Sequence, residues 1–410
     1  MEVRADASVA DGDPLRSQTS YVRPLLLVAG ALVAAGITWR LATEVQRLLF
    51  EPQGPLDLLF LRGLIRQWFA GIPFYEDRGG IHPPAVFLLL WPLYGWGSEA
   101  GGRWVYALAT VPVVAGFAWL LVREARPETG VERALLTILV IGCYPTAITI
   151  GNGQVTFFIL FAALAGIFLF LHQARGDARD AALTGLFLIA LVKPNLTLPF
   201  FWVIAFSGGW PRPAILAVVA YLLATAASVM LHGASLYDLH SMLYSWYART
   251  EHGVSESGYG NVHEWFGDLG LSPWAMPASL VIFALHGLWA WRHRGADLWV
   301  LIGVAAIVAR LWAYHRVYDD LLLIFPLIAL YRLRRRPQPD RGAWALFVLG
   351  AAALAAPITP ILMHATWALV AVWLLQLAYL MRTAALYRGV SVATGRISSS
   401  SETPPWRKAP

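Results

Sequence analysis

Lys193 is one of only two lysines in the 410 residues, and it lies within the apolar run 183–206. The other, Lys408, lies in a polar tail. A lysine at the centre of a membrane helix costs about 3 kcal/mol on insertion scales, so we expect the chain to use this one intramembrane cation. None of the 25 acidic residues lies in the middle of an apolar run. A cation near one membrane face, with carboxylates gathered at loop ends, suggests a site for an anionic, lipid-linked substrate.

Asp57 is the first carboxylate beyond the first apolar run that could do chemistry. It lies in the segment Gly54-Pro55-Leu56-Asp57. A carboxylate at the membrane surface can take the proton of an acceptor hydroxyl as that hydroxyl attacks a sugar carbon. An acid that follows a proline is also a common first-turn residue of a helix, where backbone N–H groups satisfy it. The spacing alone leaves both interpretations open.

Polar side chains between later apolar runs form a second group of candidates. Asn152 and Gln154 can hydrogen-bond sugar hydroxyls, but their Gly-Asn-Gly-Gln segment can equally form a tight turn between helices. The loop 232–272 is rich in His, Tyr and Trp. Its rings can stack on sugars in an acceptor groove, or part of the loop can form an amphipathic surface helix. Its histidines, including His263, lack convincing ligand spacing, so we predict no metal site.

The composition is that of a polytopic membrane protein, with 58% hydrophobic and 14% charged residues. The net charge of +6 comes mostly from arginines beside apolar runs, which orient a chain in a bilayer and do not imply nucleic acid. The single Cys143 excludes intrachain disulfides. We expect one integral membrane domain over 24–382, with disordered cytoplasmic tails at 1–23 and 383–410.

Ten apolar runs are long enough, with snorkelling flanks, to be full spans. They are 25–43, 104–122, 134–150, 155–171, 214–231, 273–291, 298–313, 321–331, 343–359 and 361–381. Two further segments are ambiguous, because 83–97 is short and contains Pro92, whereas 183–206 is interrupted by Pro194 and Pro199. The pattern predicts an all-α polytopic bundle of about 12 transmembrane or partly spanning helices.

Arginine positions select between two threadings of the ambiguous segments. In one, 83–97 stays at the outer surface and 183–206 forms two short helices that meet near Lys193. Five arginines then lie in the cytoplasm, as the positive-inside rule favours: Arg123, Arg126, Arg133, Arg175 and Arg179. If both segments cross once, these five lie outside. The favoured threading places the loops 44–103 and 232–272 on the outer face, together with the polar candidates.

Several of these segments together resemble glycosyltransferase family 87. The first are Asp57, the turn Gly71-Ile72-Pro73-Phe74-Tyr75, and His82-Pro83-Pro84 ahead of an apolar run. The later ones, in family order, are Gly151-Asn152-Gly153-Gln154, the stretch from Thr184-Gly185 to Lys193-Pro194, and Tyr314-His315-Arg316-Val317-Tyr318-Asp319. Members of this family are polyprenyl-phosphate-sugar-dependent enzymes of the GT-C superfamily, typified by phosphatidylinositol mannoside mannosyltransferases. His82 departs from the pattern, which often has an aromatic residue there.

The resemblance implies an inverting transfer of a hexose, with mannose favoured, from a polyprenyl-phosphate-sugar to a lipid or glycan acceptor. It implies Asp57 as the catalytic base, no cofactor, and a site on the non-cytoplasmic face of a cell membrane. The departing phosphate monoester is a dianion that needs compensating charge. The expected substrate-binding residues are Lys193, His315 and Arg316 at the phosphate, together with Asp319, Tyr75, His82, Asn152, Gln154 and His263. Asp319 can instead be an acid at a helix N-terminus.

Two other classes of membrane protein stay open at this point. One is a polytopic lipid or solute transporter or flippase. Such proteins, when proton-coupled, usually need carboxylates or histidines at mid-membrane depth, and the middles of the apolar runs contain no Asp or Glu. A polymerase or ligase that uses diphosphate-linked glycans would also place Arg and His in outer loops. The chemistry of the donor separates that class from the monophosphate-dependent one.

Overall fold

The computed structural model describes residues 14–72, 82–95, 97–207, 211–240, 242, 260–335, 340–355 and 359–394. Within these ranges the chain forms sixteen α-helices and three 3-10 helices, and no strand. Chain contacts divide it into residues 1–43, which supply only the first part of a helix, and residues 44–410, which contain everything else. The predicted all-α polytopic fold is confirmed.

The helices have the following bounds, in chain order: α1 (Pro14–Phe50), α2 (Leu56–Phe69), α3 (Pro84–Tyr94), α4 (Glu99–Ala125), α5 (Gly130–Gly142), α6 (Tyr144–Asn152), α7 (Thr156–His172), α8 (Asp177–Ala190), α9 (Pro194–Ser207), α10 (Arg212–Leu231), η1 (Leu236–Asp238), α12 (Val262–Asp268), η2 (Ser272–Trp274), α13 (Ala275–Arg292), α14 (Leu298–Leu311), η3 (Val317–Leu323), α15 (Ile324–Arg334), α16 (Arg341–Ala355) and α17 (Thr359–Thr394). At both ends the helical part is longer than the sequence predicted, because α1 begins inside the expected first tail and α17 continues into the expected last one. Residues 1–13 and 395–410 lie outside the described residues.

Full-length membrane spans are fewer among the described helices than the ten that the apolar runs predicted. Four segments are long and apolar enough: Glu99–Ala125, Arg212–Leu231, Ser272–Arg292 and Thr366–Leu386. A fifth is possible if α5 and α6, which meet at an angle of 42°, count as one broken span. The remaining apolar helices are shorter, for example the 14-residue α14. At a rise of about 1.5 Å per residue, their lengths are less than the ~30 Å thickness of a hydrocarbon core.

The run 134–150 was predicted as one span, and the structure divides it at Cys143. Cys143 has an extended backbone, with ψ 151°, and Pro145 stands in the first turn of the helix that follows. A proline in that position lacks the N–H that a continuous helix needs, so the chain starts a new helix there. After the bend, α6 packs against η3.

The predicted break in 183–206 is present at Leu191–Lys193, between α8 and α9. Pro194 begins α9 and cannot donate a hydrogen bond back into α8. The Thr197 hydroxyl donates to the Ala190 carbonyl at 2.7 Å, which satisfies one of the oxygens freed by the break. Lys193 therefore lies at a helix junction. The other ambiguous segment, 83–97, contains only the 11-residue α3, which is too short to span.

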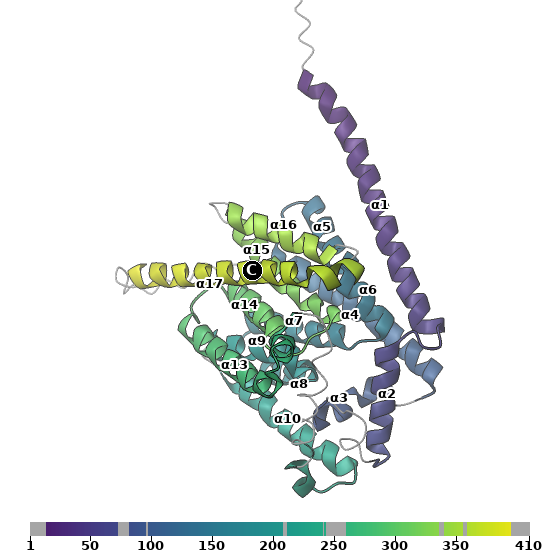
Figure 1. The fold of residues 1–410 in the computed structure, drawn as a ribbon. Coiled ribbons are helices and arrows are strands. Elements are labelled where there is room, and N and C mark those ends of the chain that lie inside the picture. The colour runs from purple at the N-terminus through teal and green to yellow at the C-terminus, as the bar shows by residue number, and fades with distance from the viewer. Residues whose placement is uncertain are drawn as a thin grey trace, which may run out of the picture. The chain divides into compact units, whose positions relative to one another are not determined.

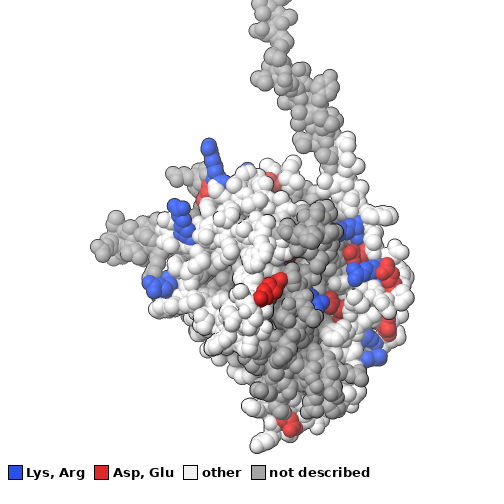
Figure 2. Space-filling view, viewed as in Figure 1, with Lys and Arg blue, Asp and Glu red and all other residues white. Residues whose placement is uncertain are grey.

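The centre of residues 44–410 is formed by α14, which packs against α9, α15 and α17 (Figure 1). Eleven of its residues are apolar or glycine and buried, and the same cluster continues through η3 into α15. By contrast α13 exposes Leu280, Val281, Leu285 and Leu288. In Figure 2 most of the visible surface is uncharged, with charged side chains in separate patches. The charged residue of α13 is the exposed Arg292 in its last turn, so the apolar stretch before it suits a face that contacts lipid.

Candidate active site

Asp57 lies in the first turn of α2, directly after Pro55 and Leu56. Its carboxylate interacts with the Gln154 side chain and, electrostatically, with Lys193, Arg316 and Asp319. Burial raises the pKa of Asp57 above its usual range, and the Gln154 hydrogen bond opposes that rise. Segments separated by as many as 262 positions along the chain, from Asp57 to Asp319, thus meet around this carboxylate.

The junction between α8 and α9 brings Lys193 to the same place. Its Nζ lies 2.5 Å from Oδ1 of Asp319 and 4.7 Å from the centre of the Tyr318 ring. Asp319 is 1% exposed and also accepts from the Thr156 hydroxyl at 3.0 Å and from the Arg316 backbone N–H at 3.2 Å. Burial alone would raise the pKa of Asp319, but the Lys193 ammonium holds it below its usual range. This buried pair joins the helix junction to η3.

Arg316 is the exposed cation of the cluster. Its Nε donates to the Tyr314 hydroxyl, and among the described residues it forms no ion pair with a carboxylate. The loop that carries it is fixed to α9, because the Asn195 side chain donates to the Tyr314 carbonyl at 2.6 Å. In return the Trp312 indole donates to the Asn195 carbonyl at 2.7 Å. Asn195 therefore ties the loop that carries Arg316 to the helix that follows Lys193, and both cations act on Asp57.

Two of the three histidines predicted for the site, His82 and His315, lie near Lys193 and are neutral. His315 is fully buried and its Nδ1–H donates to the Ala313 carbonyl at 2.8 Å, which leaves Nε2 without a hydrogen-bond partner among the described residues. Burial lowers the pKa of His315 to about 3. Burial, aided by the Lys193 charge, lowers the pKa of His82 to about 4. Both histidines therefore lie in the electrostatic neighbourhood of Lys193, and neither adds positive charge there.

Three other predicted residues lie apart from this cluster or outside the description. Asn152 accepts a hydrogen bond from Arg47 at 2.8 Å, so its carbonyl oxygen is already engaged. His263 in α12 is bonded to the Ser279 hydroxyl at 2.8 Å, and burial lowers its pKa to about 4. Tyr75 lies outside the described residues.

A second buried ion pair, which was not predicted from the sequence, involves the residue after Asp319. Arg310 and Asp320 are 1% and 3% exposed, and the Arg310 Nε donates to the carboxylate. The Tyr144 hydroxyl donates to the other carboxylate oxygen, and the Trp373 ring lies 4.7 Å from the guanidinium. Lys193 is therefore not the only cation within an apolar run, which corrects that expectation. Arg310 lies inside the run 298–313, so its position was visible in the sequence although its partner was not.

Arg103, in the first turns of α4, fixes the chain just ahead of Asp57. Its guanidinium donates to the backbone oxygens of Glu51 at 2.6 Å and Pro52 at 2.7 Å, and to the Glu99 carboxylate at 2.8 Å. Five N–H donors in a planar fork make arginine well suited to hold several carbonyls of one turn. This contact anchors the turn between α1 and α2.

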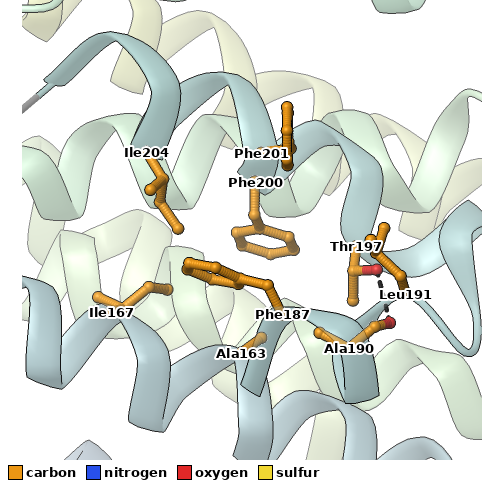
Figure 3. Close-up of a pocket in the computed structure, with 9 residues that line it drawn as sticks. All are labelled: Ala163, Ile167, Phe187, Ala190, Leu191, Thr197, Phe200, Phe201 and Ile204. Atoms are coloured by element: carbon orange, nitrogen blue, oxygen red, sulfur yellow. Dashed lines mark hydrogen bonds between the residues drawn. The ribbon is translucent and has the colours of Figure 1, made fainter. Parts of the chain in front are cut away.

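A small apolar cavity lies beside the α8–α9 junction, between α7, α8 and α9 (Figure 3). Its walls include Phe187, Phe200 and Ile204. Its volume of about 10 Å³ holds roughly one water molecule and no lipid chain. We assign it no ligand. Within the described ranges, no three His, Cys, Asp or Glu side chains lie close enough together to hold a metal ion.

Comparison with known families assigns this arrangement to a class. The family model of glycosyltransferase family 87 matches residues 81–333, more than half of the chain. The chain belongs to glycosyltransferase family 87. It is therefore a membrane glycosyltransferase, and the family match includes Lys193, His315, Arg316 and Asp319. Asp57 precedes the matched segment, so its role depends on geometry and motif order. No curated protein and no solved structure matches the chain.

Proposed function

We propose that this family 87 protein transfers a hexose, with mannose favoured, from a polyprenyl phosphate carrier to a lipid or glycan acceptor, with inversion at the anomeric carbon. The observation that carries the proposal is the meeting of one half-buried carboxylate, Asp57, with two cations from distant segments, Lys193 and Arg316. A base next to positive charge is the arrangement that a hydroxyl nucleophile and a phosphate leaving group require.

In the proposed reaction the acceptor hydroxyl oxygen bonds to the anomeric carbon while its proton passes to the Asp57 carboxylate. The bond from that carbon to the phosphate oxygen breaks, and its electron pair leaves with the polyprenyl phosphate monoester. Because Asp319 neutralises much of the Lys193 charge, Arg316 is the cation with charge left for the phosphate. Lys193 adds a hydrogen-bond donor at short range.

His315 remains a proposed substrate contact, but its neutral ring uses its Nδ1–H on the Ala313 carbonyl, so Nε2 can only accept a hydrogen bond and suits a sugar hydroxyl, not a phosphate oxygen. Asp319 orients Lys193 and ties it to η3. His82, Asn152, Gln154, Tyr75 and His263 remain proposed substrate contacts, with the loop 232–272 on the acceptor or prenyl side.

We also propose that the site faces the non-cytoplasmic side of a cell membrane. The helices α7 and α15 lead from the site to an arginine-rich end of the bundle, because Thr156 begins α7 and His172, at its end, is bonded to Glu124 at 2.7 Å. At that end Arg332 donates to the Glu124 backbone oxygen. Arg335 pairs with Glu128 at 2.9 Å and with Glu132 at 3.0 Å. The positive-inside rule places such an end in the cytoplasm.

The test is sugar transfer by the purified protein in liposomes that contain mixed lipid acceptors. Labelled mannose and glucose are supplied on polyprenyl phosphate, and the same sugars on polyprenyl diphosphate in parallel. We expect transfer from polyprenyl-phosphate-mannose, with the product anomer inverted relative to the donor. Transfer from the diphosphate carriers alone would replace the proposed donor class, and a retained anomer would overturn the single-displacement mechanism.

A further inference from the structure

Two buried tyrosines from different helices hold one short turn of backbone. Tyr94 at the end of α3 donates its hydroxyl to the Gly153 carbonyl at 2.9 Å. Tyr106 in α4 donates to the Gln154 carbonyl at 2.8 Å and approaches the Thr149 carbonyl at 3.2 Å. The two rings lie 6.2 Å apart, and the two residues are 1% and 0% exposed. Consecutive carbonyls are thus both fixed by hydroxyl groups that water does not reach.

The turn that they hold lies against the start of α2. Gly153 has φ +70°, and a Cβ placed on it would lie 2.4 Å from the Leu58 Cβ. Leu58 is the residue after Asp57, so the backbone of the turn touches α2 where the carboxylate is. Gln154, the next residue of the turn, has a side chain that interacts with the Asp57 carboxylate and lowers its pKa. Both Tyr94 and Tyr106 also interact electrostatically with Asp57.

We propose that Tyr94 and Tyr106 are positioning residues that aim the Gln154 amide at the Asp57 carboxylate. Two donors on neighbouring carbonyls fix the orientation of the peptide group between them, and that orientation sets the direction in which the Gln154 side chain leaves the backbone. Its importance for turnover rests on the proposed role of Asp57 as base; the positioning itself does not. This gives Gln154 a task other than the sugar contact considered from the sequence.

The orientation of the Gln154 amide would therefore help to determine the pKa of Asp57. An amide N–H that donates to a carboxylate favours the charged form, so losing it raises the pKa of the carboxyl group. Other groups that face Asp57 are unchanged by the substitutions below. They are Lys193 at the helix junction and Arg316, Asp319, Tyr314 and Tyr318 around η3. A change in proton affinity would therefore report the Gln154 contact and not a change in net charge.

The experiment measures how readily Asp57 is protonated, without using turnover. A hydrophobic carbodiimide, which reacts with protonated carboxyl groups, is applied to the full chain in detergent micelles over a pH series. Labelling is read by mass spectrometry on the peptide that contains Asp57. The variants are Tyr94→Phe, Tyr106→Phe, Gln154→Leu and Tyr106→Phe combined with Gln154→Leu. The control is Tyr221→Phe, whose hydroxyl has no hydrogen-bond partner among the described residues.

We expect Gln154→Leu to move the labelling midpoint upward by about one pH unit. Each Phe variant should move it in the same direction by a smaller amount, and the double variant should match Gln154→Leu alone. Tyr221→Phe should leave the midpoint in place. A merely structural role for the tyrosines would lower thermal stability without moving the midpoint.

The outcomes separate this inference from the proposed function. If correctly folded Tyr94→Phe and Tyr106→Phe both keep the wild-type midpoint, or if the double variant shifts further than Gln154→Leu, the positioning role is overturned. If the midpoint shifts as expected while Asp57→Asn still transfers sugar, the positioning stands and the role of Asp57 as base falls. If a Phe variant fails to fold, the other tyrosine gives the same test through the same turn.

Discussion

The Nζ of Lys193 lies 2.5 Å from Oδ1 of Asp319, although 126 positions separate the two residues. The contact links the junction between α8 and α9 to η3, and it is almost completely removed from water, with side chains that are 13% and 1% exposed. The single cation that stands out in the sequence is therefore half of a pair. The pair holds a donor close to Asp57 while Arg316 remains available for an anionic ligand.

Breaking this pair from either side should destabilise the protein. Lys193→Met leaves a buried carboxylate and Asp319→Asn leaves a buried ammonium, and each loss of a partner typically costs about 3–5 kcal/mol. The double variant should be more stable than additivity predicts, with a coupling of about 1–3 kcal/mol. Chemical unfolding in mixed micelles measures all three. If the two single effects add up to the effect of the double variant within about 0.5 kcal/mol, the two side chains do not depend on each other.

Replacing Asp57 should separate stability from turnover. Burial raises the pKa of Asp57, so the folded protein holds that proton more tightly than the unfolded chain does. The stability from this group is present below the unfolded pKa and is lost as pH rises through the raised folded pKa. Asp57→Asn carries no charge and should melt at or above the wild-type temperature at pH 7. The difference should vanish as pH falls below the raised value. A large fall in melting temperature at pH 7 would contradict this.

The same shift predicts an acid limb in the pH profile of sugar transfer. A base acts only when deprotonated, so transfer should fall as pH drops through the raised pKa of Asp57, above the ~3.9 of a free aspartate. The profile of the rate at saturating donor, measured from pH 4 to 8 on protein that stays folded, checks it. Neither neutral histidine in the cluster titrates at higher pH, since burial lowers the pKa of His82 to about 4 and of His315 to about 3. A profile that stays flat down to pH 4 would mean that Asp57 is not the group that loses a proton.

Gly153→Ala should damage the site specifically. Its φ of +70° disfavours a side chain, and the new Cβ would meet the Leu58 Cβ at 2.4 Å. A Cβ atom is fixed by the backbone and cannot rotate away, so α2 must move to relieve the clash. Transfer should then drop at least tenfold. Gly130→Ala is the matched control, since nothing lies within 4 Å of a Cβ there. Normal transfer by folded Gly153→Ala would contradict the close packing of the turn on α2.

The buried pair Arg310–Asp320 should matter for folding. Arg310→Met leaves the Asp320 carboxylate with the Tyr144 hydroxyl but without its counter-charge, at a typical cost of about 3–5 kcal/mol. We expect poor recovery of folded protein, measured by size-exclusion chromatography in detergent. Recovery equal to that of Arg294→Met, an exposed arginine on α13's trailing loop, would show that the pair carries little of the stability.

Much of the fold follows from local pattern. Apolar runs predict most of the helices, and Pro194 predicts the break beside Lys193. Both signals are local, because each affects the backbone only a few residues away. Helix length does not follow in the same way. The run 298–313 ends as a helix at Leu311, two residues short of its apolar end, and the run 321–331 begins as a 3-10 turn. Composition marks what prefers lipid, whereas tertiary contacts decide where a helix stops.

The site follows from the sequence only in part. Residue types and motif order singled out Asp57, Lys193 and Arg316, which the fold places together. The partners Asp319 for Lys193 and Tyr106 for the Gln154 turn are contacts between distant segments, and no spacing rule reports them. Arg310 was visible as a charge inside an apolar run, and asking what neutralises it would have pointed to the acids that follow.

The central claim is that Asp57 is the base for transfer from a polyprenyl-phosphate-sugar. The most direct measurement compares wild type, Asp57→Asn and Asp177→Asn in liposomes with labelled polyprenyl-phosphate-mannose. Asp177 is a matched control because its side chain is 86% exposed at the start of α8. We expect wild type and Asp177→Asn to transfer mannose at similar rates, and Asp57→Asn to lose at least a hundredfold. Transfer by folded Asp57→Asn at a near-normal rate would contradict the account.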